Sequence, residues 1–220
     1  MFKQEELEKW FEDLRKIIFD TKVSIDNIKR MAHPLNDFEV QVIKHGFFYN
    51  FFRQSRFVII VQLCKLFGDN KNQRINIHKL FNRLTTDKYD DKLQKRLDEN
   101  NPEKGLFKNR AEILKEVDLL KSEIAAENSL IKRVVDLRNK FYAHSDPNSI
   151  LSTVTNEELE SLVNLAIKTY NSIHGKIFDV TFLFSHNQDW SVNYPITTLA
   201  ANRKEQLEKL KQKRALDEKL

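Results

Sequence analysis

The chain has 220 residues, enough for one large domain or two small ones that bury most of their apolar surface without an external staple. Its single cysteine, Cys64, excludes an intramolecular disulfide and therefore a disulfide-framed secreted fold. The net charge of +5 is compatible with nucleic-acid binding but does not require it. Only four glycines and four prolines occur, so we expect few turns and long helices.

The N-terminal half predicts two long helices. Apolar residues recur at helical spacing over residues 5–28, and His33-Pro34 should end this first helix. Asn36 and Glu39 resemble a capping box, so a second helix should begin there and run to Phe67. The second helix is apolar on nearly all sides, and we expect it to be the most buried element.

The next part of the chain is more polar, with short helical patterns at residues 75–84 and 88–97, and we interpret residues 69–110 as an insertion or cap. A third long helix is predicted from about Asn109 to the Ser-Asp-Pro sequence at residues 145–147. A capping box at Thr155 and Glu158 then starts a fourth, which continues to residue 184.

Four long helices predict an all-α helical bundle over residues 1–184. Residues 185–220 form a C-terminal extension in this interpretation. Within the extension, residues 186–198 lack a helical period and should be irregular, whereas residues 201–220 suit a solvated helix or a frayed tail.

The sequence lacks the residues that several classes of function require. None of the glycines lies in a phosphate-binding loop, so no nucleotide cofactor is expected. The six histidines show no metal-ligand spacing, and we expect no protein-held metal. Cys64 lies in the most apolar helix and is interpreted as core. The N-terminus does not resemble a signal peptide and no apolar stretch is long enough for a membrane span, so a cytoplasmic location is expected.

The segment from Arg138 to His144 carries the residue types that metal-independent RNA cleavage requires. An imidazole can take the proton of a ribose 2′-hydroxyl or donate one to the departing 5′-oxygen, and a guanidinium can hold the phosphate. Six helical residues separate the two side chains by about 9 Å and roughly 120° of rotation. They converge only if the helix end unwinds or a second chain contributes. We therefore predict a homodimer whose two helix ends share one cleft.

The same segment, Arg138-Asn139 followed by Phe-Tyr-Ala-His and Asp146, resembles the signature of the HEPN superfamily and its abortive-infection AbiU branch. The resemblance implies a dimeric helical bundle and, in many members, a metal-independent endoribonuclease of a defence or toxin–antitoxin system. It implies that Arg138 and His144 are catalytic and that Asn139 positions the arginine or the substrate. Tyr142 and Asp146 take supporting roles, RNA is the substrate, and a cognate antitoxin protein is a possible partner.

Simpler interpretations stay open beside this one. Arg138 and His144 would also suit a helix C-terminus, where cations oppose the helix dipole. Arg53 and Arg56 either hold phosphate in the same cleft or line the solvated edge of the second helix. The basic residues between positions 71 and 96 either guide RNA or form a solvated face. The alternative function is a non-catalytic helical module that dimerises and binds RNA or a protein.

Overall fold

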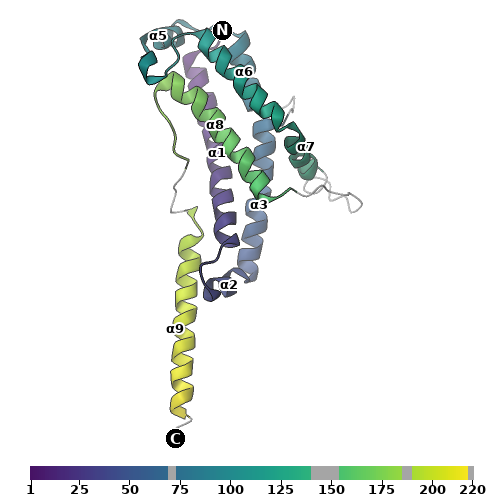
Figure 1. Cartoon of the computed structure of the whole chain (residues 1–220), viewed down its shortest axis with the longest axis vertical. Helices are drawn as coiled ribbons and strands as arrows, with labels where there is room; N and C mark the ends of the chain where they lie inside the picture. The colour runs from purple at the N-terminus through teal and green to yellow at the C-terminus, as the bar shows by residue number, and fades with distance from the viewer. Residues whose placement is uncertain (69–72, 140–153, 185–189, 218–220) are drawn as a thin grey trace. The chain divides into compact units, whose positions relative to one another are not determined.

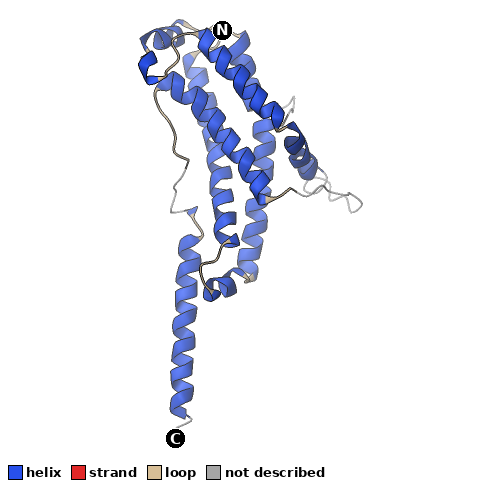
Figure 2. Cartoon of the chain, viewed as in Figure 1, coloured by secondary structure: helices blue, strands red, loops and turns tan. Residues whose placement is uncertain are grey.

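The computed structural model of the chain describes residues 1–68, 73–139, 154–184 and 190–217. In these stretches the chain forms nine α-helices and one short 3-10 helix (Figure 1). The β-structure in this part of the chain is a single parallel bridge between Phe2 and Tyr89, and Figure 2 accordingly shows helices joined by loops. The predicted all-α class is confirmed.

The chain divides into two compact units, which are described separately. The first unit comprises residues 1–22 and 58–186, and the second comprises residues 23–57 and 187–220. Two long helices belong to both units, because α1 (Gln4–Ala32) starts in the first and ends in the second, and α3 (Gly46–Phe67) does the reverse.

The first unit is built around apolar faces of α1, α3, α6 and α8. Besides α1 and the end of α3, its helices are α4 (Ile77–Thr86), α5 (Asp91–Glu99), η1 (Pro102–Lys104), α6 (Arg110–Ala126), α7 (Asn128–Leu137) and α8 (Asn156–Phe178). The fully buried side chains recur every three or four residues, as in Leu7, Phe11, Leu14 and Ile18 of α1 and Ile113, Val117, Leu120 and Ile124 of α6. The amphipathic spacing therefore points each helix toward one core.

The second unit is smaller and contains the end of α1, α2 (Asp37–Ile43), the start of α3 and α9 (Asn193–Asp217). Its core consists of Met31, Phe48, Val192 and Ile196, packed against partly buried residues of α2 and α3. Asn27 joins α1 to the segment before α9, since its side-chain amide donates to the carbonyl of Trp190 and accepts from the backbone N–H of Val192, both at 2.9 Å.

The helix start that the Asn36 cap predicts is found, but the second helix is broken. Asn36 accepts from the backbone N–H of Glu39 at 3.0 Å, and α2 then stops at Ile43. The backbone tightens at residues 44–45, and the ring of His45 accepts from the N–H of Phe47 at 3.3 Å to open α3. The prediction of one continuous helix to Phe67 is wrong at this turn.

The expectation that this second helix is the most buried element is wrong for its first half. Phe47 and Tyr49 are 64% and 61% exposed, and Phe57 is also exposed. The last turns, from Ile59 to Phe67, are largely buried. The apolar surface of α3 is thus core in the first unit and partly solvent-facing in the second.

The third predicted helix is divided, and the fourth is shorter than the sequence pattern indicates. The predicted end of the third helix at residues 145–147 lies outside the described residues. The third is divided by Glu127, whose non-helical backbone separates α6 from α7. The fourth starts at the predicted capping box, with Thr155 and Glu158 bonded in both directions at 2.8 and 3.2 Å. It ends at Asp179, which adopts a left-handed conformation at φ 56°.

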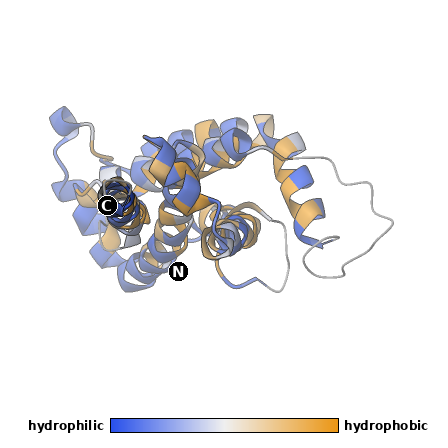
Figure 3. Cartoon of the chain, turned by 90° about the horizontal axis from the view of Figure 1, so that it is seen from below, coloured by the Kyte–Doolittle hydropathy of each residue, from blue (hydrophilic) through white to orange (hydrophobic). Residues whose placement is uncertain are grey.

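Phe184 lies beyond this end and is nevertheless buried. The extended segment that carries it is bonded to α8, since Asn171 exchanges two 3.0 Å hydrogen bonds with the backbone of Phe182. Residues 193–198, expected to be irregular, form the first turns of α9. Leu199 and the following residues continue this helix as the expected solvated helix, whose last turns are mostly hydrophilic (Figure 3).

Candidate active site

Arg138 lies directly after the last turn of α7. Its backbone N–H donates to the carbonyls of Val134 and Val135, and residues 138–139 continue the chain in π-helical geometry. A single π turn at the end of an α-helix changes the direction of the side chains that follow, and such turns are frequent at functional sites. The 9 Å and 120° expected from a regular helix therefore do not apply at residues 138–139.

The side chain of Arg138 is half-buried against α3. Its Nε–H is buried and has no hydrogen-bond acceptor among the described residues. The side chain interacts with Cys64, which is buried in the core as predicted. Burial raises the pKa of the Cys64 thiol, and the charge and hydrogen bonding of Arg138 oppose that rise. The thiol in turn donates weakly to the carbonyl of Val134 at 3.7 Å.

No sequence signal connects Cys64 with Arg138, because they are far apart in the chain and meet only when α3 packs against α7. A neutral thiol is a poor acceptor and does not neutralise a guanidinium. The structure thus presents a partly desolvated cation with an unused donor, an arrangement suited to an anionic ligand.

The helix that carries Arg138 is fixed to the start of α8. Arg133 of α7 forms an ion pair with Glu158 of α8 at 2.5 Å, and the same carboxylate completes the cap at Thr155. The hydrogen bond from Arg133 and that from the Thr155 backbone lower the pKa of Glu158. Glu158 therefore links α7, which precedes residues 140–153, to the first turn of α8, which follows them.

Of the other motif residues, only Asn139 belongs to the part of the chain that the structure describes. Asn139 is half-buried beside Arg138 in the π turn. His144, Tyr142 and Asp146 lie outside the described residues, and their convergence on Arg138 stays a prediction.

The two secondary arginine candidates belong to the second unit. Arg53 is exposed and lies over the ring of Tyr49, with 5.9 Å between the guanidinium carbon and the ring centre. Arg56 is half-buried in the same helix. Their role in holding phosphate stays a prediction.

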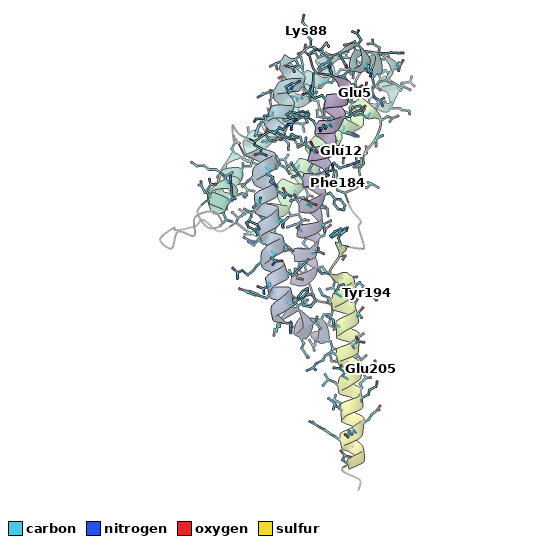
Figure 4. All side chains as sticks on the ribbon, turned by 180° about the vertical axis from the view of Figure 1, so that it is seen from behind. Glu5, Glu12, Lys88, Phe184, Tyr194 and Glu205 are labelled. Carbon is cyan, nitrogen blue, oxygen red and sulfur yellow. The ribbon has the colours of Figure 1, made fainter. Side chains whose placement is uncertain are left out.

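Several members of the basic run between positions 71 and 96 have intramolecular partners. Arg83 pairs with Glu6 at 2.9 Å, Lys92 with Glu5 at 2.7 Å, and Arg96 donates to the carbonyls that end α8 at 3.2 and 3.3 Å. Figure 4 shows Glu5 and Lys88 at the end of the first unit where these pairs occur. These contacts favour a structural role over RNA guidance for the arginines and lysines concerned.

His174 of α8 is another histidine of the first unit. Tyr170 stacks on its ring at 5.0 Å, and three phenylalanine rings also contact it. The Nδ1 atom bonds the carbonyl of Val180 at 2.9 Å, and burial lowers the pKa of the imidazole. His174 is therefore part of an aromatic cluster that packs α8 against the segment after it.

Two further observations concern membranes and metals. None of the helices in the described stretches is long and apolar enough to cross a bilayer. Across residues 1–68, 73–139, 154–184 and 190–217, no three side chains of His, Cys, Asp or Glu gather into a possible metal site. His144 and Asp146 are outside the residues that were searched, so metal independence stays a prediction.

Comparison with known families agrees with the motif and the fold. The family model described as AbiU2, of the HEPN type, matches residues 4–192. The chain belongs to the HEPN AbiU2 family. No curated protein and no solved structure matches it. The match includes residues 69–110, the region interpreted from sequence as an insertion, and reaches the start of the C-terminal extension.

This membership confirms the resemblance that the Arg138-Asn139 segment suggested. AbiU2 is a family associated with abortive infection, and HEPN domains are commonly ribonucleases. The predicted division at residue 184 stays a prediction.

Proposed function

We propose that this AbiU2 protein is a metal-independent endoribonuclease, acting as a defence or toxin–antitoxin effector. Family membership supports the ribonuclease class. The single structural observation that supports it is the half-buried guanidinium of Arg138, whose buried Nε–H has no acceptor among the described residues. A phosphodiester supplies two acceptor oxygens and a negative charge at such a donor.

In the proposed reaction the ribose 2′-oxygen loses its proton and attacks the adjacent phosphorus. The bond from phosphorus to the 5′-oxygen breaks, and that oxygen receives a proton, which leaves a 2′,3′-cyclic phosphate and a 5′-hydroxyl. His144 and its copy in a second chain act as base and acid. Arg138 holds the pentavalent phosphate and neutralises its added charge.

The remaining motif residues support these two. Asn139, in the π turn, positions Arg138 or the substrate, and Tyr142 and Asp146 support the histidine. Arg53 and Arg56 are proposed as contacts to phosphates away from the cleaved bond. A homodimer supplies both histidines, and a cognate antitoxin would block the shared cleft.

The test is RNA cleavage in the presence of a chelator. The wild type should cleave, whereas Arg138→Ala and His144→Ala should each lose about 100-fold or more in rate, the scale for removing one transition-state contact. Arg138→Lys, which keeps the charge and loses the fork, should also be impaired. His33→Ala, a change at an exposed histidine outside the motif, serves as the control.

Two outcomes would contradict the proposal. If wild-type cleavage requires a divalent cation, the mechanism is wrong. If the wild type binds RNA with strong salt dependence but never cleaves it, the non-catalytic binding module is the better description.

A further inference from the structure

The second unit carries an apolar groove that no part of the described chain fills. Its volume is about 640 Å³. It lies between α2, the start of α3 and the middle of α9, and is lined by Gln41, Val42, His45, Phe47, Phe48, Leu199, Asn202, Arg203 and Gln206. Phe47 at its edge is 64% exposed and Leu199 is 47% exposed. A groove with this much uncovered apolar surface is typical of a binding surface.

The face of α9 that lines the groove continues beyond it. Leu210 follows Leu199 by eleven residues, which is about three helical turns, so the two leucines lie on the same face. Leu210 is 53% exposed. Around it, residues 201–215 of α9 are exposed except for the half-buried Leu207. Figure 4 shows this part of α9, where Glu205 is labelled, extending past Tyr194 and the turns that pack on α2.

This face is self-complementary when read in opposite directions. From its N-terminal end it presents Leu199, Arg203, Gln206 and Leu210 in order. In an antiparallel pair of identical helices centred between residues 204 and 205, Leu199 faces Leu210 and Arg203 faces Gln206. Apolar side chains then meet apolar ones, and the guanidinium meets an amide oxygen that can accept its N–H.

We propose that α9 of a second copy of this chain occupies the groove, antiparallel to the first, so that Leu210 of each copy packs against Phe47 and Leu199 of the other. The arrangement is isologous and closes at two chains. It also gives the exposed half of α9 the packing that a short helix needs to be stable in water. The interface lies in the second unit and does not rest on the proposed nuclease.

The charge of the groove distinguishes binding of a second copy from binding of an acidic partner helix. Its charged or ionisable lining residues are His45 and Arg203, and no carboxylate lines it. Pairing two copies brings two Arg203 side chains toward the same surface. Added salt screens this repulsion and should tighten the pair, whereas an acidic partner helix would bind more weakly in salt.

Sedimentation of the purified full-length protein without RNA tests the proposal. The proposed nuclease is also a homodimer, so the result that tests this interface is the effect of Leu210→Glu. It should weaken the dissociation constant of the wild-type dimer by roughly 100-fold or more, because each dimer then buries two charges against apolar surface. The matched control is Leu119→Glu, since Leu119 of α6 is equally exposed at 54%. A monomeric wild type, or a Leu210→Glu protein that dimerises as well as the control, overturns the proposal.

A cross-linking experiment tests the antiparallel register. Leu199→Cys and Leu210→Cys chains, each with a different tag, are mixed and oxidised; the native Cys64 is buried. Disulfides should form between the two kinds of chain and far less within either kind alone. Preferential Leu210→Cys self-pairing would indicate a parallel arrangement and overturn the register. Cross-linking is read without RNA, so its failure is separable from failure of the nuclease.

Discussion

Replacing Arg138 by methionine should stabilise the protein while abolishing cleavage. A buried donor without an acceptor costs about 1–3 kcal/mol, and the Arg138 Nε–H is such a donor among the described residues. Against this, a cation after the last turn of a helix contributes about 0.3–1 kcal/mol. Methionine fills similar space but has neither the unsatisfied donor nor the helix-end charge. The net expected gain is therefore about 1 kcal/mol, or about 2–4 °C in Tm for a chain of this size.

Urea and thermal unfolding of Arg138→Met and wild type, together with the chelator-treated RNA assay, measure both effects. Arg133→Met on the same helix is the matched control, since Arg133 pairs with Glu158 at 2.5 Å. Because the Arg133–Glu158 pair is solvent-accessible, its loss should destabilise the protein only slightly, which is the opposite sign to the effect expected for Arg138→Met. If Arg138→Met destabilises the protein as Arg133→Met does, Arg138 is a structural helix-end cation and the reasoning fails.

Three further predictions concern the stability of the fold. Glu39 is buried at 2% exposure and accepts from Arg30 and from the Leu35 N–H, both at 2.7 Å, so Glu39→Ala should cost about 3 kcal/mol in urea unfolding; a loss below about 1 kcal/mol would contradict this. Asn27→Ala removes both bonds to the Trp190–Val192 segment and should cost about 2 kcal/mol by the same measurement, with exposed Asn50→Ala as a near-neutral control. Burial lowers the pKa of His174 below its usual 6.5, so the unfolded chain binds a proton first and stability should fall as pH drops below about 6.5. His174→Gln should lose this component of the pH dependence, and an unchanged profile would refute it.

Helix starts were predictable because the signals are local. Asn36, Asn109 and Thr155 each accept the backbone N–H three residues later, and a side chain that satisfies such a donor acts within one turn. The helix breaks at residues 44–45 and at Glu127 were not predicted. The apolar pattern continues through both, so the local sequence carries no signal for either break.

Burial was less predictable than helicity. The first turns of α3 are as rich in phenylalanine as a core helix, yet Phe47 and Tyr49 are exposed. Apolar composition indicates that a surface will be covered but not by what. The covering element here is the proposed second copy, which a single chain cannot show.

The sequence by itself determined the helical class, most helix starts and the Arg138-Asn139 motif, since periodicity, caps and motif spacing act over a few residues. Only the tertiary structure decided that Arg138 packs beside Cys64 with an unused Nε–H, that the chain after α8 is clamped by Asn171, and that α9 leaves a self-complementary face uncovered. Each of these depends on which distant segments meet. Contacts of that kind arise from packing a whole unit, and no local pattern encodes them.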